Sequence, residues 1–393
     1  MSLPITVPYT FANATTSIPL SQLDTDIATI YSTVNGIGNG TVALSNVVIT
    51  GGIISNVSGI TTSSISNGTS NVSIATANGS VVVSTAGNTA ITVDTSQNMI
   101  SGGTVVMASS FKRNRIINGN MQIWQRATTA TGNYSTGYAY TTVDRWAIYS
   151  PNSSTTVSQS TSVPTGFQYS VKVQRPSGST ATGSIQLGQC IESLNCYDLA
   201  AQTDTLSFWA KAGANFSGSS LGLTIPTGTV ADQGIANYAS WTGLTYPLNT
   251  TTAITTTWTK YTFTVTFGAG VLEANVQFNY IPTGTAGADD AVYITGVQLE
   301  VGTKATPYEM QIYSDQLAQC QRYYQTVPAG TLVAPINVWS TTTFSVALRA
   351  TPSGTILGIS GGSFTDGPYF PQGGITFLYS ATSGFGYAVS AEL

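Results

Sequence analysis

The sequence predicts a mainly β protein with a short N-terminal helix, a fibrous β-rich stalk, a β-sandwich head and a smaller C-terminal β-sandwich. Two observations predict this class. Apolar residues alternate with Ser, Thr and Asn at period two along most of the chain, which is typical of strands. Charged residues make up only 7% of the 393 residues. They also divide the chain, because residues 1–111 carry three Asp and no Lys or Arg, whereas residues 112–312 carry ten charges of each sign.

The charge balance argues against two classes of partner. A net charge of −4 and a pI near 4.7 give no general attraction to nucleic acid or anionic lipid. No stretch approaches the roughly 18 apolar residues of a membrane span, so we expect neither nucleic-acid binding nor membrane insertion. Cys190, Cys196 and Cys320 are an odd number and cannot form a disulfide framework. We expect them to be buried, reduced thiols.

Residues 1–39 contain the predicted helix, in the stretch "PLSQLDTDIATIYSTVNGIG". Its apolar residues recur every three or four positions and form one narrow seam, which suits parallel association with copies of the same chain. Packing of the seam on a different protein is the alternative. The seam residues, which are our candidate trimerisation contacts, are Leu20, Leu23, Ile27, Ile30 and Val34.

Residues 40–111 consist of short Val- and Ile-rich runs broken by Gly and Asn, as in "NVVITGGIISNVSGI". None of the runs is long enough to build a core of its own. A disordered linker is the alternative, but such linkers are usually richer in charge and poorer in Val and Ile. The segment therefore predicts a fibrous stalk whose strands bury their apolar faces between neighbouring chains.

Residues 112–312 predict the β-sandwich head. The predicted strands are "NMQIWQR", "DRWAIY", "FQYSVKVQR", "SIQLGQCIES", "TLSFWAKA", "TWTKYTFTVTF", "NVQFNYI" and "AVYITGVQLEVG". Alternation places Leu206 and Phe208 on one face of their strand, and Val276 and Phe278 on one face of theirs. Those faces form the expected core. Residues 313–393 predict a short helix at "SDQLAQCQRYY" and then the smaller β domain.

Several motifs resemble known proteins. The strings "RNRIINGNMQIWQR", "DRW", "LSFWAKA", "TWTKYTFTVTF", "VYITGVQLEVGTKATPYE" and "LAQCQRYYQ", in this order, resemble the receptor-binding part of bacteriophage tail fibres and related virion fibre proteins. The resemblance covers about residues 112–326, and its middle portion is similar to jelly-roll carbohydrate-binding modules. The opening "LPITVPYTFA" and "IPLSQLD" resemble the virion-attachment end of such fibres.

The resemblance implies a homotrimeric virion fibre that binds a bacterial surface glycan through its head. Its N-terminal segment would attach to a tail or capsid protein, and the protein would assemble in the host cytoplasm and lie on the virion surface. The resemblance does not separate a tail fibre from a capsid head fibre or decoration protein. A capsule depolymerase is the enzymatic alternative.

The inventory of side chains argues against catalysis. The chain has no histidine, which removes the commonest general base. Glycoside cleavage would need two carboxylates about 5 to 9.5 Å apart, and the equal numbers of acids and bases in the head favour structural ion pairs instead. We therefore expect no enzyme and no cofactor. Asp289 and Asp290 form a candidate calcium-binding pair in a loop, although adjacent carboxylates more often face solvent.

Saccharide binding would use exposed aromatic rings beside amides, since the rings stack on sugar C–H groups and amides bond to hydroxyls. For any single Trp, burial is the alternative. The candidate contacts are Trp209, Asn275, Gln277 and Asn279 on an outward sheet face, and Tyr238, Trp241 and Tyr246 in a predicted loop.

A basic cluster stands at the start of the head, where "KRNRIINGNMQIWQR" holds four of the twelve basic residues. We expect Arg115, Arg126 and Arg145 to pair with carboxylates such as Asp144, Glu300 or Glu309. An anion held near a trimer axis by Arg113 or Arg115 is another interpretation.

Overall fold

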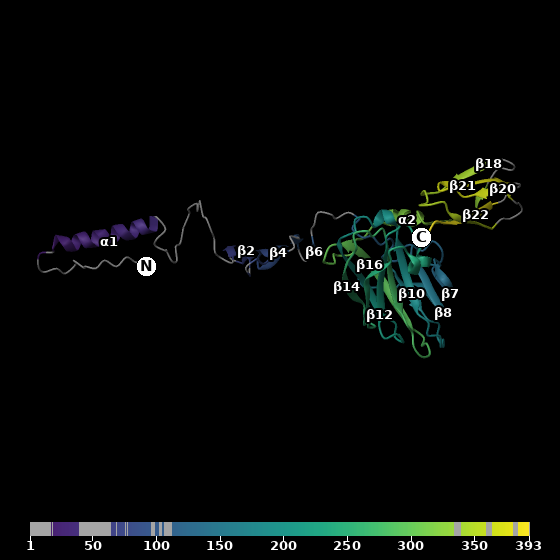
Figure 1. Ribbon diagram of the computed structural model, residues 1–393, viewed down its shortest axis with the longest axis horizontal. Coiled ribbons are helices and arrows are strands. Elements are labelled where there is room, and N and C mark those ends of the chain that lie inside the picture. Colours follow the sequence, from purple (N-terminus) through teal and green to yellow (C-terminus); the bar gives the residue numbers. More distant parts are fainter. Residues whose placement is uncertain are drawn as a thin grey trace. The chain divides into compact units, whose positions relative to one another are not determined.

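The computed structural model forms two compact units, residues 1–65 and residues 66–393, and each is described by itself (Figure 1). The described residues are 17, 19–38, 64–67, 69–74, 76, 78–95, 99–101, 104–105, 112–333, 339–358, 364–379 and 384–392. The stretch "LPITVPYTFA", which resembles a virion-attachment motif, lies outside these residues. Residues 40–63 of the predicted stalk also lie outside them.

The predicted N-terminal helix is confirmed as α1 (Leu20–Gly38). Its burial pattern is the reverse of an ordinary amphipathic helix. Polar Asp26 and Thr33 are buried, whereas the five residues of the apolar seam are between 43% and 73% exposed. Neither described helix is long and apolar enough to cross a membrane.

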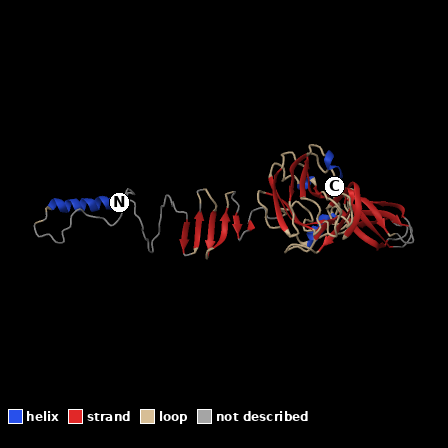
Figure 2. Ribbon diagram, turned by 90° about the horizontal axis from the view of Figure 1, so that it is seen from below, coloured by secondary structure: helices blue, strands red, loops and turns tan. Residues whose placement is uncertain are grey.

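The described part of the stalk is a single antiparallel sheet in which each strand pairs with the next (Figure 2). Its strands are β1 (Ser64–Asn67), β2 (Ser70–Ile74), β3 (Val81–Thr85), β4 (Asn88–Val93), β5 (Met99–Ser101) and β6 (Thr104–Val105). Val72 pairs with Val83, and Val83 pairs with Ile91, so β-branched side chains share one face. Val72 and Ile74 are nevertheless each 43% exposed.

The head is the predicted β-sandwich. Its strands are β7 (Thr129–Ala139), β8 (Ala147–Ser160), β9 (Ser170–Gln174), β10 (Ile185–Ile191), β11 (Thr203–Ala212), β12 (Leu221–Gly228), β13 (Thr245–Thr252), β14 (Thr259–Thr266), β15 (Glu273–Tyr280) and β16 (Ala291–Val301). The strand order is β13-β12-β15-β10-β8-β9-β16-β11-β14, with β7 paired to β8. The first part of β8 pairs with β10 and its last residues pair with β9, so this long strand joins the two layers.

The two layers meet through the side chains that alternation predicts. Leu187 and Phe278 point inward from the β10–β15 layer, and Leu206 and Phe208 point inward from β11. The rings of Phe208 and Phe278 contact edge to face with centroids 4.8 Å apart. This contact between layers defines the core of the head.

One predicted strand of the head is wrong. The stretch "NMQIWQR" forms a loop around the buried Asn118, which has a φ of 57°. The side-chain Oδ1 of Asn118 accepts the N–H groups of Gln122 and Ile123, and its Nδ2 donates to the backbone carbonyl oxygens of Ile123 and Asp144. These four bonds satisfy the backbone as a strand ladder would. Strands β7, β12 and β13 were not among those predicted.

The C-terminal part confirms a second, smaller β-sandwich. It contains α2 (Tyr313–Gln321), β17 (Tyr324–Val333), β18 (Trp339–Thr343), β19 (Ser353–Leu357), β20 (Phe364–Tyr369), β21 (Gly374–Tyr379) and β22 (Gly384–Ser390). These strands form two sheets, β17-β22-β19 and β18-β21-β20, around a core that includes Phe377 and Phe385.

Buried charge joins this part to the head. Glu392 binds Arg126, with 3.0 Å between Oε1 and Nη2, and also binds the Arg145 guanidinium. Arg145 lies 3.5 Å from the centre of the Tyr323 ring, and the Ala391 N–H donates to the Tyr323 carbonyl oxygen at 2.7 Å. The predicted pair of Arg126 with Asp144 is confirmed at 3.0 Å.

Candidate functional site

The outward face of the β12-β15-β10-β8 layer carries several amide side chains. Gln186 of β10 lies opposite Tyr149 of β8 and opposite Asn279 of β15, and Gly188 lies opposite Gln277. Opposite residues share a face, and the neighbouring Leu187 points into the core. The amides of Gln186, Gln277 and Asn279 therefore point away from the core.

Tyrosine rings border these amides. Tyr138 of β7 stacks on Tyr149 with centroids 5.3 Å apart, and it contacts the edge of Tyr238 at 6.0 Å. The Tyr138 hydroxyl donates to the side-chain Oε1 of Gln186 at 2.6 Å. Burial raises the pKa of the Tyr138 hydroxyl well above its usual range, so the group stays protonated at neutral pH. The surface offers aromatic rings and neutral hydrogen-bonding groups.

A glycine lets one of the amides lie flat on the sheet. The Asn279 side chain extends over Gly222 of β12, where an added Cβ would come within 1.7 Å of Asn279 Oδ1. Any other residue at position 222 would displace that amide.

The segment 229–244 between β12 and β13 covers part of this face. It contains η2 (Ile235–Ser240), and Ile235 and Trp241 pack on Ala147 and Cys190. Trp241 is only 4% exposed and its indole N–H donates to the Gly234 carbonyl oxygen at 3.2 Å. The expectation that Trp241 lies in an exposed loop is therefore wrong.

The two tyrosines predicted beside Trp241 lie in different elements, Tyr238 in η2 and Tyr246 in β13. Tyr238 is half-buried against Tyr138, and Tyr246 is 45% exposed in β13 instead of in a loop. Of Tyr238, Trp241 and Tyr246, only Tyr238 borders the surface formed by the amides of Gln186, Gln277 and Asn279, which we call the amide surface.

Two amides beneath the covering segment carry buried atoms without a hydrogen bond. Asn275 is fully buried, and both its Oδ1 and its Nδ2 are without a hydrogen bond, as is Nε2 of the buried Gln277. A buried polar atom without a partner costs about 1–3 kcal/mol. Few buried polar atoms in native proteins lack a partner, so these two amides mark an unusual place in the sandwich.

Trp209 belongs to a different surface. It points outward from β11, where it pairs with Lys260 of β14 and with Thr295 of β16 in the opposite layer of the sandwich. The sequence grouped Trp209 with Asn275, Gln277 and Asn279 as one polar sheet face, and this grouping is wrong. Alternation gives the outward residues of each strand, but it does not say which layer the strand joins.

The adjacent carboxylates Asp289 and Asp290 do not form the expected calcium pair. Asp290 is fully buried against Arg175 at 2.8 Å, and it accepts the Ser217 N–H at 2.8 Å. Asp289 binds Lys172 at 2.8 Å and accepts the Tyr293 hydroxyl. Because a cation already holds each carboxylate, we no longer assign a metal to them, and no group of three or more potential ligands occurs among the described residues.

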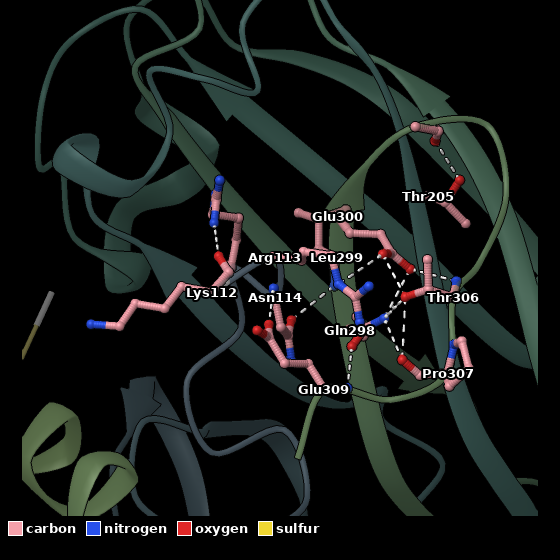
Figure 3. A network of polar contacts seen from close by, with 12 residues as sticks. Lys112, Arg113, Asn114, Thr205, Gln298, Leu299, Glu300, Thr306, Pro307 and Glu309 are labelled. Atoms are coloured by element: carbon pink, nitrogen blue, oxygen red, sulfur yellow. Dashed lines mark hydrogen bonds and ion pairs between the residues drawn. The ribbon is translucent and has the colours of Figure 1, made fainter. Parts of the chain in front are cut away.

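Two other buried carboxylates of the head, Glu300 and Glu273, are bound by protein donors. Glu300 accepts Gln298 Nε2 at 2.8 Å, and the hydroxyl and N–H of Thr306 at 2.7 and 2.8 Å (Figure 3). Glu273 accepts the Gln233 N–H at 2.7 Å and the Cys190 thiol, and burial raises its pKa to about 7. These bonds give both carboxylates a structural role in the sandwich.

Comparisons with known proteins found only distant structural likenesses. No protein-family model and no curated protein matches the sequence. The enzymatically active domain of tailspike protein 4 from bacteriophage CBA120 is 16% identical over 48% of this chain and 22% of that chain, with a TM-score of 0.32. A CBM4 structure is 21% identical over 47% of this chain and 98% of that chain, with a TM-score of 0.30.

A family 22 carbohydrate-binding module of Clostridium thermocellum Xyn10B is 12% identical over 46% of this chain and 100% of that chain, with a TM-score of 0.29. All three TM-scores are low, so the likeness assigns neither ligand nor activity to this chain. The amides and tyrosines of the outward face carry the functional argument instead.

Proposed function

We propose that the protein is a non-catalytic saccharide-binding fibre of a bacteriophage virion. The observation that carries the saccharide assignment is the set of amides on the outward face of β10 and β15, which includes Gln186 and Asn279. Sugar hydroxyls both donate and accept hydrogen bonds and match such amides. The Tyr138 and Tyr149 rings supply apolar surface for sugar C–H groups.

The fibre assignment rests on the ordered motifs of residues 112–326 and on the exposed seam of α1. In this proposal the seam joins three copies, the N-terminal segment attaches to a tail protein, and the heads lie at the virion surface. Three weak sites in one fibre bind a bacterial surface far more tightly than one site does. Attachment to the host is therefore multivalent and non-covalent.

The test is glycan-array and whole-cell binding by the full chain. Gln186→Ala and Asn279→Ala each remove an amide from the outward face, and we expect each to weaken binding about tenfold because hydrogen bonds to a ligand are lost. Gln168→Ala is the matched control, since Gln168 is an exposed amide that precedes β9 and lies outside this face. Thermal unfolding of each variant checks that the fold is retained.

Intact binding by Gln186→Ala and Asn279→Ala would refute this surface as the saccharide site. Absence of binding by the full chain to any glycan or host cell would favour the capsid head fibre or decoration protein. Release of reducing sugar from a bound polysaccharide would instead identify a depolymerase.

A further inference from the structure

A cavity lies on the head, where the basic cluster of residues 112–126 meets the segment around α2. Its volume is about 290 Å³, close to the lower end of the ~300–1,000 Å³ typical of ligand pockets. The cavity is thus large enough for one small ligand or one residue of a longer ligand. Its lining residues are Lys112, Asn114, Arg115, Ile117, Asn195, Gln311, Gln319, Arg322 and Tyr323.

The charge of this lining is unusual for the chain. Three of the twelve basic residues of the protein are among the lining residues, and those residues include no carboxylate. Lys112 and Arg115 come from the start of the head, and Arg322 follows α2. In Figure 3 the Lys112 side chain extends away from the network around Glu300. An anionic ligand would meet cations from two distant parts of the sequence.

Carboxylates outside the lining hold both arginines in place. Arg115 donates from Nε to Asp198 at 3.1 Å and also binds Asp198 through Nη2, and Arg322 Nη1 lies 3.1 Å from the buried Glu192. Arg115 Nη1 donates to the Lys112 carbonyl oxygen. Side chains that are fixed before binding lose less conformational entropy when the ligand binds.

The neutral lining points to a ligand that carries hydroxyl groups as well as charge. Gln311 Oε1 is buried without a hydrogen-bond partner, so it requires a donor. Amides of Asn195 and Gln319 also line the cavity, and Ile117 and Tyr323 provide its apolar wall. An anion without a hydroxyl group, such as chloride or sulfate, would leave the Gln311 acceptor unmatched, whereas a sugar hydroxyl would supply the donor.

We propose that this cavity binds the carboxylate and a hydroxyl of an acidic sugar residue. Lys112, Arg115 and Arg322 provide the positive charge that recognises the carboxylate, and Gln311 accepts the hydroxyl. The site is separate from the amide surface of β10 and β15, which presents neutral groups. The assignment to a sugar rests on the proposed saccharide-binding function, whereas the binding of an anion does not.

The test measures binding of glucuronate, glucose and inorganic phosphate to the full chain by calorimetry at low ionic strength. We expect glucuronate to bind and glucose to bind at least tenfold more weakly. Lys112→Gln and Arg115→Gln should each weaken glucuronate binding about tenfold, because each removes a charged group. Lys304→Gln is the matched control, since it removes a lysine whose side chain is 53% exposed outside the cavity.

The outcomes separate this proposal from the proposed function. Glucuronate binding that survives both Lys112→Gln and Arg115→Gln, or that equals glucose binding, overturns the site. Phosphate binding without glucuronate binding overturns the assignment to a sugar. Gln186→Ala should leave glucuronate binding unchanged, so failure of the amide surface does not affect this result. Because Lys112 is exposed, Lys112→Gln keeps its fold even if Arg115→Gln does not.

Discussion

The stalk and the head use the same β-branched residues but bury them to very different extents. In the head, Val171 and Val173 of β9 are 0% and 3% exposed, whereas Val72 and Ile74 of the stalk are each 43% exposed. Both regions are antiparallel, so strand pairing does not explain the difference. The head covers its sheet with a second layer, and no such layer covers the stalk sheet among the described residues. The apolar face of the stalk sheet is therefore half-exposed in a single chain.

The largest expected effect concerns assembly through α1. Ile27→Asp combined with Ile30→Asp places charge in the exposed seam, and we expect the mass in light scattering to fall from three copies to one. Burying these charges between helices would cost several kcal/mol. Ala28→Asp is the control, because Ala28 is exposed beside the seam and outside it. A wild-type chain that is a stable monomer would show that α1 does not join copies of the chain.

A smaller effect is expected from one substitution made in both regions. Ile294→Ala in β16 removes a side chain that is 1% exposed, and we expect it to lower the free energy of unfolding of the head by about 2–5 kcal/mol. Ile74→Ala in β2 should cost under about 1 kcal/mol in a single chain, because Ile74 is half-exposed. Chemical denaturation measures both.

The same two variants also test whether neighbouring chains cover the stalk in the assembled protein. If neighbouring chains cover the stalk, the cost of Ile74→Ala should rise toward that of Ile294→Ala when unfolding is measured on the assembled protein. An equal cost in assembled and dissociated protein would show that no other chain covers Ile74.

The smallest expected effect is the pH dependence of the head. Asp204 of β11 is fully buried, and neither carboxylate oxygen has a hydrogen-bond partner. Burial, and then the charge of Asp198, raise its pKa from 3.8 to about 7. The folded head therefore binds a proton that the unfolded chain has lost, so its stability falls as pH rises from about 4 through 7.

Asp204→Asn should reduce this loss, because the amide does not titrate. Between pH 5.5 and pH 8 we expect the wild type to lose about 1–2 kcal/mol more than the variant, measured by urea denaturation. Asp144 and Glu273, whose pKa values burial also raises to about 7, account for part of the remaining slope. Equal slopes for wild type and variant would show that Asp204 is ionised in the folded head.

The sequence predicts local periodicity better than it predicts which segments meet. The seam of α1 and the inward residues Leu206 and Phe208 follow from spacing alone. The burial of Trp241 does not, because it depends on Ala147 and Cys190 of distant strands. The unpaired amide of Asn275 is likewise visible only when the segment that covers it is placed.

Ion pairs show the same limit. Arg126 pairs with Asp144, which is one of the carboxylates that the sequence offered to the three arginines without assigning partners. Arg115 binds Asp198 and Arg145 binds Glu392, and neither partner is predicted. Glu309 instead accepts the Asn114 N–H at 2.8 Å, and Glu300 lies 4.0 Å from Arg113. Composition indicates that charges pair, but only the folded chain assigns the partners.

The bonds of Glu392 with Arg126 and Arg145 also bear on how the head and the C-terminal domain respond to a pulling force. Arg126 and Glu392 are separated by 266 positions in sequence, yet their side chains are bonded. A force applied between residue 112 and the C-terminal domain would load these ion pairs and the Ala391–Tyr323 hydrogen bond. Bonds loaded in parallel share the force, so we expect the head and its C-terminal domain to resist separation as one body.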